Sequence, residues 1–205
     1  MEKDFFIVGY SGHSFVILDS ALRCKLKCKG YYDLKSKKAN PFEIQYLGTE
    51  ENISAGEEIM ITIGDNQVRK RIYEKLVEKE SITFLNIVDP KASLSNFAKL
   101  KLNSSVFIGP NSVVNSFAEI ELAAIINTGA IVEHEAKIGE FSHVGPNATV
   151  CGGAQVGANV FVGANAVIKQ GIRIGDNSIV GAGAVVMQDL QANSTYVGNP
   201  AVKIH

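Results

Sequence analysis

Two histidines with acidic neighbours are the residues of this chain whose types and spacing could do chemistry. His134 stands between Glu133 and Glu135, and His143 follows nine residues later. An imidazole exchanges a proton near neutral pH, and an adjacent carboxylate sets its tautomer and basicity, so His134 could serve as a general base. The alternative is two solvated surface histidines, which composition alone favours. A zinc site needs at least three ligands, and this part of the chain offers only two histidines.

A glycine turn near the N-terminus, Gly9 to His13 (GYSGH), is the second candidate. An apolar run precedes it and an amphipathic stretch follows from Ser14, which predicts a strand, a turn and a helix. The N–H groups at a helix N-terminus bind phosphate. Because the Gly-x-Gly-x-x-Gly pattern is incomplete, a structural turn with glycine at positive φ is an equal alternative. Asp33 could contact a ribose or a base, or be solvated in an exposed loop.

The segment that carries both histidines repeats every six residues. Each sixth residue from Leu102 to Val186 is aliphatic, fifteen times in all, and a small residue usually follows four positions later. This period fits neither a helix nor an alternating strand. It predicts a parallel β-helix of triangular section, with three hexads in each coil and the aliphatic side chains inside. Seven glycines follow an aliphatic residue directly, where a Cβ would be costly: Gly109, Gly139, Gly145, Gly157, Gly163, Gly175 and Gly181.

The first ninety residues follow a different pattern, in which strands and helices alternate. We expect strands at 5–9, 30–32, 44–47, 58–63 and 83–88, and helices at 14–25 and 67–78, the second capped by Asp65 or Asn66. Such alternation predicts a small parallel sheet with helices on its faces. The predicted divisions are an α/β domain at 1–89, the β-helix at 90–186 and a capping segment at 187–205.

Composition narrows the class of protein. A net charge of −1 gives no electrostatic reason to expect nucleic acid or an anionic membrane as a partner. The three cysteines are an odd number without metal-ligand spacing, which favours a reducing compartment. No apolar run is long enough for a signal peptide or a membrane span. We therefore expect a cytoplasmic protein.

At this point the residues resemble a known family. The stretches 127–135 (NTGAIVEHE) and 138–144 (IGEFSHV) are similar to the sugar O- and N-acyltransferases related to the sialic-acid O-acetyltransferase NeuD. The resemblance is greatest to the bacterial nucleotide-4-amino-sugar N-acetyltransferases typified by PglD. It covers essentially the whole chain, including the turn at 9–13, the stretches 63–66 and 69–73, the hexads and the ending 197–201.

The resemblance implies a fold, a reaction and an assembly. The implied fold is a Rossmann-like nucleotide-sugar-binding domain, then a left-handed β-helix of hexapeptide repeats and a C-terminal cap. The implied reaction is transfer of acetyl from acetyl-CoA, without a metal, to the amine of a UDP- or dTDP-linked 4-amino-4,6-dideoxy sugar for glycan biosynthesis. The implied assembly is a homotrimer with active sites between subunits.

The resemblance also assigns roles to particular residues. His134 is implied as the base that deprotonates the amine during direct attack on the thioester, with Glu135 as its acidic partner. His143 is implied near the thioester carbonyl, and the Gly152 N–H as the donor to the oxyanion. The implied cofactor-binding residues are His143, Gly152, Ala164 and Ala182. The implied substrate-binding residues are Gly12, His13, Ser14, Asp33, Lys35 and Asn127.

Two alternatives to this function stand beside it. Relatives often carry two adjacent acids where this chain has Tyr32 and Asp33, so the choice between uracil and thymine nucleotides stays open. The first alternative is sialic-acid-type O-acetylation, which keeps the fold and acetyl-CoA. The second is a non-enzymatic β-helix binding module, against which the separate matches at Gly12, His134 and His143 argue.

Overall fold

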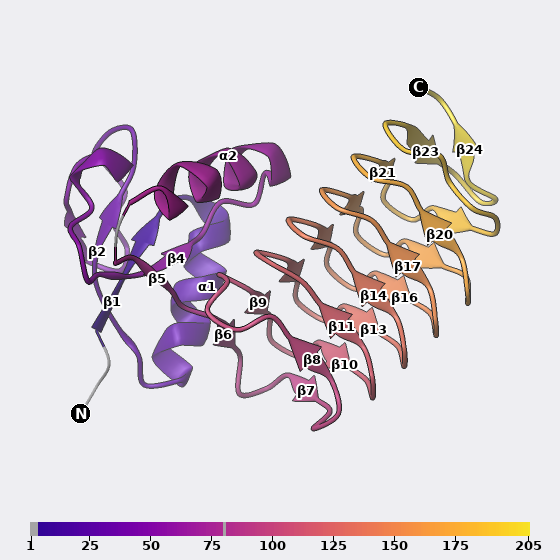
Figure 1. Ribbon diagram of the computed structural model, residues 1–205, viewed down its shortest axis with the longest axis horizontal. Coiled ribbons are helices and arrows are strands. Elements are labelled where there is room, and N and C mark those ends of the chain that lie inside the picture. Colours follow the sequence, from indigo (N-terminus) through magenta and orange to yellow (C-terminus); the bar gives the residue numbers. More distant parts are fainter. Residues whose placement is uncertain (1–3, 80) are drawn as a thin grey trace.

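The N-terminal part of the computed structural model, which describes residues 4–79 and 81–205, is a parallel α/β domain (Figure 1). Its five-stranded sheet has the order β3-β2-β1-β4-β5, which confirms the prediction of a small Rossmann-like sheet. The strands are β1 (Asp4–Val8), β2 (Lys27–Tyr32), β3 (Gln45–Tyr46), β4 (Glu58–Ile61) and β5 (Thr83–Phe84), and the helical elements are α1 (Gly12–Arg23), η1 (Glu50–Asn52) and α2 (Asn66–Val77).

The two helices cover opposite faces of this sheet. Ile17 and Leu18 of α1 belong to a buried cluster that also includes Phe107 and Ile125 of the following domain, so α1 lies between the sheet and that domain. The α2 side chains pack with β4 in a separate cluster. The helix α2 begins as expected, because the carboxylate of Asp65 accepts a hydrogen bond of 2.8 Å from the Val68 N–H.

The rest of the chain is a left-handed solenoid with three flat sides. We call its sides the docking face, the apolar face and the charged face. The docking face consists of β6 (Ile87–Val88), β9 (Phe107–Ile108), β12 (Ile125–Ile126), β15 (His143–Val144), β18 (Phe161–Val162), β21 (Ile179–Val180), β23 (Thr195–Val197) and β24 (Val202–Lys203). The apolar face consists of β7 (Ser93–Leu94), β10 (Val113–Val114), β13 (Ile131–Val132), β16 (Thr149–Val150), β19 (Val167–Ile168) and β22 (Val185–Val186). The charged face consists of β8 (Lys99–Leu100), β11 (Glu119–Ile120), β14 (Lys137–Ile138), β17 (Gln155–Val156) and β20 (Arg173–Ile174).

The strand register confirms three hexads per coil. Val144 pairs with Val162, 18 residues further along the chain, and the same step recurs from Ile108 to the end of the repeats. The predicted strand at 83–88 is divided, because β5 pairs with β4 of the α/β sheet whereas β6 pairs with β9 of the solenoid. At the other end, β24 pairs antiparallel to β23 and closes the docking face.

The prediction that Leu102 lies inside the solenoid is wrong. Leu102 continues the six-residue spacing but is 80% exposed, whereas Leu100 packs against the solenoid core. From Leu100 of β8 to Ile108, the interior aliphatic residue of the next strand, β9, the distance along the chain is eight residues instead of six. Two extra residues in this connection therefore shift the register, and the apolar residue at 102 matches the repeat only by coincidence.

The corners of the solenoid explain its glycines and asparagines. A Cβ on Gly139 would lie 2.5 Å from the backbone carbon of Gly157 in the next coil, so close approach of backbones requires the glycine. From Ile108 to Val180, the residue three positions after each interior aliphatic residue has positive φ and is usually Asn or Gly. The exceptions in this range are Phe117, Ala123, Glu135 and Phe141.

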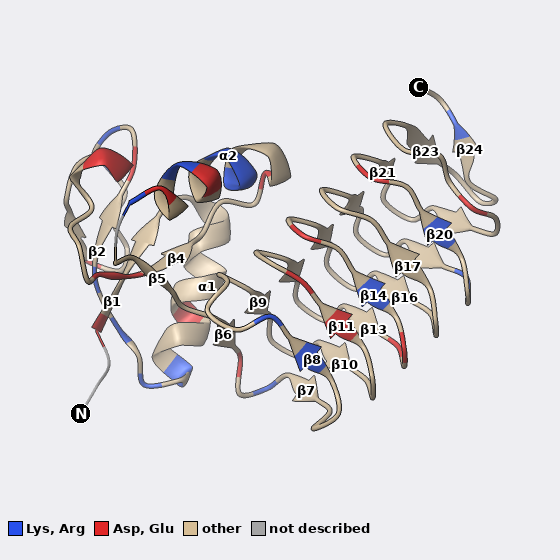
Figure 2. Ribbon diagram, in the orientation of Figure 1, with Lys and Arg blue, Asp and Glu red and all other residues tan. Residues whose placement is uncertain are grey.

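The outward side chains distinguish the three faces. The charged face carries Lys99, Glu119, Lys137 and Arg173 (Figure 2), and both lysines pair with Glu119 at 3.1 and 2.9 Å. The N-terminal part of the docking face is covered by the α/β domain, which buries Phe107 and Ile125, whereas Ile179 further along this face is exposed. The apolar face presents partly exposed side chains from a row of strands: Val113, Ile131, Thr149, Val167 and Val185.

A single buried arginine joins the two domains. Arg69 of α2 is fully buried, and burial lowers the pKa of its guanidinium to about 9. Its Nε donates to the Ala123 carbonyl at 2.9 Å and its Nη2 to the Phe141 carbonyl at 2.6 Å, both on solenoid corners. Within its own domain it donates to the carbonyls of Ile63 and Gly64, each at 3.0 Å, and to Asn66 Oδ1 at 2.9 Å.

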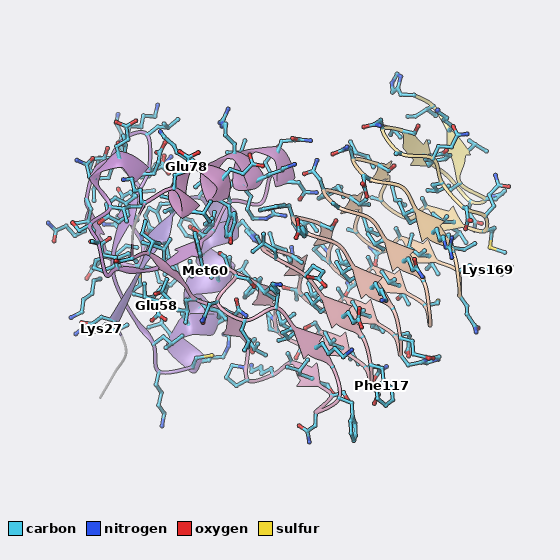
Figure 3. All side chains as sticks on the ribbon, in the orientation of Figure 1. Lys27, Glu58, Met60, Glu78, Phe117 and Lys169 are labelled. Atoms are coloured by element: carbon cyan, nitrogen blue, oxygen red, sulfur yellow. The ribbon has the colours of Figure 1, made fainter. Side chains whose placement is uncertain are left out.

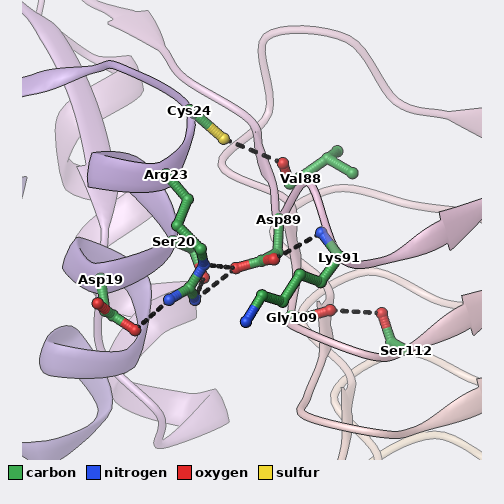
Figure 4. A network of polar contacts seen from close by, with 9 residues as sticks. All are labelled: Asp19, Ser20, Arg23, Cys24, Val88, Asp89, Lys91, Gly109 and Ser112. Atoms are coloured by element: carbon green, nitrogen blue, oxygen red, sulfur yellow. Dashed lines mark hydrogen bonds and ion pairs between the residues drawn. The ribbon is translucent and has the colours of Figure 1, made fainter.

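A second connection lies at the C-terminal end of α1 (Figure 4). Arg23 donates from Nε and Nη2 to Asp89 Oδ2 at 2.9 and 2.6 Å, just after β6. Burial alone would raise the pKa of Asp89, but the hydrogen bonds from Arg23 and Ser20 lower it overall. The Lys91 N–H completes the site at 2.8 Å from Oδ1. This ion pair fixes the helix to the first coil.

Replacement of Arg69 by methionine is expected to weaken the fold strongly. The change leaves buried carbonyl groups on both domains without a donor, so we expect the free energy of unfolding to fall by about 3–5 kcal/mol. Urea unfolding measures this loss, and Arg71→Met, at an exposed position of the same helix, is the matched control. A loss of less than about 1 kcal/mol for Arg69→Met would show that the hydrogen bonds of Arg69 between the two domains are dispensable.

Candidate active site

His134 projects outward from the corner between the apolar and charged faces. Its side chain is 55% exposed, and Nδ1 lies 3.2 Å from Glu135 Oε2. Glu133 turns the other way and accepts from Asn115 Nδ2 at 2.9 Å. The carboxylate of Glu135 favours the tautomer with the proton on Nδ1. The other ring nitrogen, Nε2, is thereby left as the free base.

Gly152 lies one coil beyond His134, on the C-terminal side, and its backbone is next to the imidazole. A Cβ at this position would lie 2.6 Å from both Cε1 and Nε2 of the ring, so only glycine leaves room for it. The Gly152 N–H has no hydrogen-bond partner in the described part of the chain, whereas the next residue, Gly153, donates to the His134 carbonyl at 2.9 Å. A free N–H beside a free base suits a reaction that develops an oxyanion.

Glu135 occupies a strained corner position to reach this histidine. Its φ is +59°, where most corners of the solenoid carry Asn or Gly. A left-handed conformation costs an ordinary residue about 1–2 kcal/mol. The carboxylate is therefore present at this corner at a cost to the fold, which is a feature of functional sites.

His143 is buried on the docking face and has both ring nitrogens occupied. Nδ1 lies 3.2 Å from the Gly64 carbonyl, so it carries the proton, and Nε2 accepts from Asn127 Nδ2 at 3.0 Å. Burial, with His13 and Arg69 close by, lowers the pKa of His143 to about 3. The ring is neutral at physiological pH and its hydrogen bonds are held by protein groups.

His13 meets His143 across the domain interface. The two ring centroids are 5.6 Å apart, and burial and then Arg69 lower the pKa of His13 to about 4. Its Nε2 is buried without a partner among the described residues. Beside this pair is a pocket of about 460 Å³, lined by His143, Asn159, Phe161 and the start of α2.

A second pocket, of about 530 Å³, opens at the carboxyl ends of β1, β2 and β4. In parallel α/β sheets, ligands bind at this edge, where the strand order reverses. Asp33 lines it, accepting from the Tyr10 N–H at 2.9 Å and pairing with Lys37 at 3.0 Å. Lys37 and Arg71 also line the pocket and were missed from the sequence, although the four-residue spacing of Asp33 and Lys37 was a usable signal. Lys35 is exposed outside it.

The glycine turn has a structural position at Gly9 and an open position at Gly12. Gly9 has a φ of +94°, and a Cβ there would lie 2.5 Å from Ile63 Cγ1, so it is structural. Gly12 has no positive φ, and nothing lies within 4 Å of the position of a Cβ. Ser14 is buried, and its hydroxyl closes the turn by accepting from the Ser11 N–H at 2.9 Å. Open space at the start of α1 is therefore found at Gly12.

One chain does not bring all the predicted residues together. His134, Glu135 and Gly152 lie on the corner between the apolar and charged faces, whereas the α/β domain covers the N-terminal part of the docking face (Figure 1). Ala164 and Ala182 stack on a different edge of the solenoid, the one between the docking and apolar faces. There the Gly183 N–H donates to the Ala164 carbonyl at 2.8 Å. His13, Asn127 and His143 form a separate group at the domain interface.

Residues 4–79 and 81–205 show neither a metal-binding cluster nor a membrane-spanning helix. These residues contain no group of three or more His, Cys, Asp or Glu side chains that could hold a metal ion. They also contain no helix with the length and apolar character needed to cross a membrane.

Comparison with known proteins matches both halves of the chain. Residues 4–76 match the model of the PglD N-terminal domain, and residues 153–188 match the hexapeptide repeat of succinyl-transferase. A variant of perosamine N-acetyltransferase from Caulobacter crescentus, solved with CoA and GDP-perosamine, is 28% identical with a TM-score of 0.91, covering 100% of this chain and 98% of that chain. These matches confirm the resemblance to the NeuD/PglD-like sugar acyltransferases.

Two further structures share the fold of this acyltransferase. The acetyltransferase domain of PglB from Neisseria gonorrhoeae, solved with acetyl coenzyme A, is 23% identical with a TM-score of 0.91, covering 100% of both chains. WeeI from Acinetobacter baumannii is 21% identical with a TM-score of 0.85, covering 98% of this chain and 100% of that chain. The chain is an enzyme of the acyltransferase class, as the sequence predicted.

The buried histidines are expected to make stability fall in mild acid. Their folded pKa values of about 4 for His13 and about 3 for His143 lie below the value of about 6.5 for an unfolded histidine. As the pH drops below about 6.5, the two histidines become protonated in the unfolded state but stay neutral in the folded state. The free energy of unfolding therefore decreases by up to about 2.7 kcal/mol per pH unit for the two groups.

Urea unfolding between pH 7 and pH 4.5 measures this slope. The double variant His13→Asn/His143→Asn should lose this part of the pH dependence, while His205→Asn, at an exposed terminal position, should keep it. An equal slope in the double variant and the wild type would show that these histidines are not the cause.

Proposed function

We propose that this enzyme transfers acetyl from acetyl-CoA to the amine of a nucleotide-linked 4-amino-4,6-dideoxy sugar. The observation that carries the proposal is the arrangement at one corner, where the free Nε2 of His134 lies beside the free N–H of Gly152 and Nδ1 is held by Glu135. The reaction of the Caulobacter relative, whose structure holds CoA and GDP-perosamine, supports the choice of acceptor.

The proposed chemistry is a direct attack with one general base. The amine lone pair attacks the thioester carbonyl while His134 Nε2 takes a proton from the nitrogen. The carbonyl oxygen becomes an oxyanion that accepts a hydrogen bond from Gly152. Collapse of this intermediate forms the amide and breaks the carbon–sulfur bond, and the imidazolium returns its proton to the departing thiolate. Glu135 stabilises the imidazolium between these steps.

A trimer would complete this site. The apolar face is the one side of the solenoid that carries neither the α/β domain nor a charged row, and cyclic symmetry is the usual way to cover such a face. If three apolar faces point toward one axis, the His134 corner of each subunit meets the edge of its neighbour that carries Ala164 and Ala182. These small residues then leave room for the pantetheine arm of acetyl-CoA, and the neighbour's α/β domain presents the acceptor.

The nucleotide is assigned to the pocket at the carboxyl ends of β1, β2 and β4. The open N–H groups of Gly12 and His13 at the start of α1 would bind its phosphates, with Lys37 and Arg71 supplying positive charge. Asp33 orders the turn and keeps one carboxylate oxygen for the ribose or base. The sequence predicts uracil or thymine, whereas the Caulobacter relative binds a guanine nucleotide, so the assay must include all three bases.

The remaining predicted residues take supporting roles in this proposal. His143 is a neutral positioning group, because its Nε2 holds the side chain of Asn127 toward the acceptor. Both substrates are intracellular metabolites, which agrees with the predicted cytoplasmic location. Ser14 acts through the turn that its hydroxyl closes.

Thiol release from acetyl-CoA tests the function directly. The acceptors are UDP-, dTDP- and GDP-linked 4-amino-4,6-dideoxy sugars, with sialic acid as the alternative hydroxyl acceptor. Turnover of an amino sugar nucleotide supports the proposal and identifies the base. Turnover of sialic acid alone would indicate O-acetylation, and the absence of any turnover by folded protein would favour a binding module.

Replacement of His134 by alanine is expected to lower kcat by about 10²–10⁴-fold, which is the usual contribution of a positioned general base. Because the side chain is exposed, the fold and the oligomeric state should not change. Steady-state kinetics and unfolding of the variant measure both effects. His205→Ala is the control, and near-normal turnover of His134→Ala would exclude the assigned base.

Replacement of Gly12 by valine is expected to raise the KM for the nucleotide sugar about tenfold or more, because its side chain would occupy the space reserved for phosphate. The KM for acetyl-CoA and the unfolding midpoint should stay close to those of the wild type. If the KM for the sugar nucleotide does not change, the phosphates bind elsewhere.

A further inference from the structure

Two phenylalanines project into solvent from the same solenoid edge as His134. Phe97 and Phe117 are 65% and 57% exposed, and their ring centroids are 5.5 Å apart. Figure 3 shows Phe117 extending from the lower edge of the solenoid, the edge that also carries Lys169. Exposed aromatic pairs of this kind are unusual on a surface that is otherwise polar at its corners.

Phe117 is retained at this corner against two costs. Its φ is +62°, at a position where this solenoid otherwise favours Asn or Gly, and a bulky residue with positive φ is strained. Its ring is also left in water. Of the three other corners from Ile108 onward that depart from Asn and Gly, two have an evident purpose in binding Arg69 through Ala123 and Phe141. The third is Glu135, the partner of His134.

The position of Phe117 along the solenoid relates it to the candidate base. Ser116 lies directly below His134, because the Glu135 N–H donates to the Ser116 carbonyl at 3.1 Å. Phe117 is therefore one coil, about 4.8 Å, from Glu135 on the side nearer the N-terminus. Gly152 lies one coil away on the opposite side. The base thus stands between an aromatic pair and a row of glycines.

The α/β domain extends along the solenoid from the height of the aromatic pair to that of Gly152. His13, at the start of α1, contacts Phe107 in the coil of Phe117 and His143 two coils further. Rotation about an axis parallel to the solenoid keeps these heights. In the proposed trimer, the neighbour's α/β domain therefore lies alongside both Phe117 and His134, so an acceptor sugar held by that domain can contact both.

We infer that Phe117, supported by Phe97, forms an apolar platform for the acceptor sugar, contacting its deoxygenated C6 methyl group. This inference rests on the proposed function and names the feature of that substrate which the site selects. A methyl group gains about 0.8 kcal/mol or more from burial against an aromatic ring, whereas a hydroxymethyl group would lose hydrogen bonds to water there. The platform thereby favours 6-deoxy sugars over their 6-hydroxy counterparts.

The variant Phe117→Asn separates this role from a structural one. Asparagine is suited to positive φ, so the unfolding midpoint should stay the same or rise. The KM for the 6-deoxy amino sugar nucleotide should increase about tenfold, with the KM for acetyl-CoA unchanged. The preference for the 6-deoxy acceptor over the 6-hydroxymethyl acceptor, measured as a ratio of kcat/KM values, should fall by about fourfold or more. Leu102→Asn, which removes another exposed apolar side chain, is the control.

Failure of the Phe117 platform and failure of the proposed acetyl transfer give different results. If the wild type acetylates no amino sugar nucleotide, the proposed function fails. If the wild type is active and Phe117→Asn keeps both its KM and its preference for the deoxy sugar, the platform is overturned. Loss of the oligomer in Phe117→Asn, seen by light scattering, would overturn it as well, since the pair would then be a subunit contact. An equal loss of selectivity in Leu102→Asn would contradict a specific role for this corner.

Discussion

The geometry of this enzyme depends on the buried guanidinium of Arg69. Among the residues that the structure describes, it has no carboxylate partner within hydrogen-bonding distance, and its five donor contacts go to oxygen atoms on both sides of the domain boundary. Planar and fixed in direction, these donors set the angle at which α2 meets the solenoid corners. The Gly64 carbonyl accepts from Arg69 and from His143 Nδ1 at once. The carbonyl that Arg69 holds in place at the domain boundary therefore also sets the tautomer of His143, a predicted active-site residue.

The 18-residue repeat of the solenoid positions the residues around His134. Because each coil advances by 18 residues, side chains at equivalent corner positions stack, which places Ser116, His134 and Gly152 in one column. Asn and Gly meet the backbone requirement at most corners. The departures at Ala123, Glu135 and Phe141 each coincide with a contact that matters elsewhere, to Arg69 or to His134. A corner residue that has positive φ and is neither Asn nor Gly thus indicates a position with a second role, in binding another residue.

The division of the site between two edges of the solenoid explains the unusual state of its histidines. His134 is exposed with one free nitrogen, whereas His143 is neutral with both nitrogens held. One is suited to exchange a proton and the other to orient its neighbour. A single chain separates the base from the nucleotide pocket, so the chemistry proposed for it requires a second copy.

The sequence by itself determined the period of the solenoid, the outward direction of His134 and the alternating α/β domain, because these follow from local spacing of apolar side chains. The need for glycine at Gly139 was also visible, because it directly follows an interior aliphatic residue at a turn of the backbone. Tertiary structure alone decided that Leu102 is outside, that Asp33 holds the turn and that His143 is locked, because these depend on two inserted residues and on partners up to 79 positions away. Arg69 shows the limit most clearly, since four of its five partners are backbone carbonyls, which a sequence does not distinguish from any others.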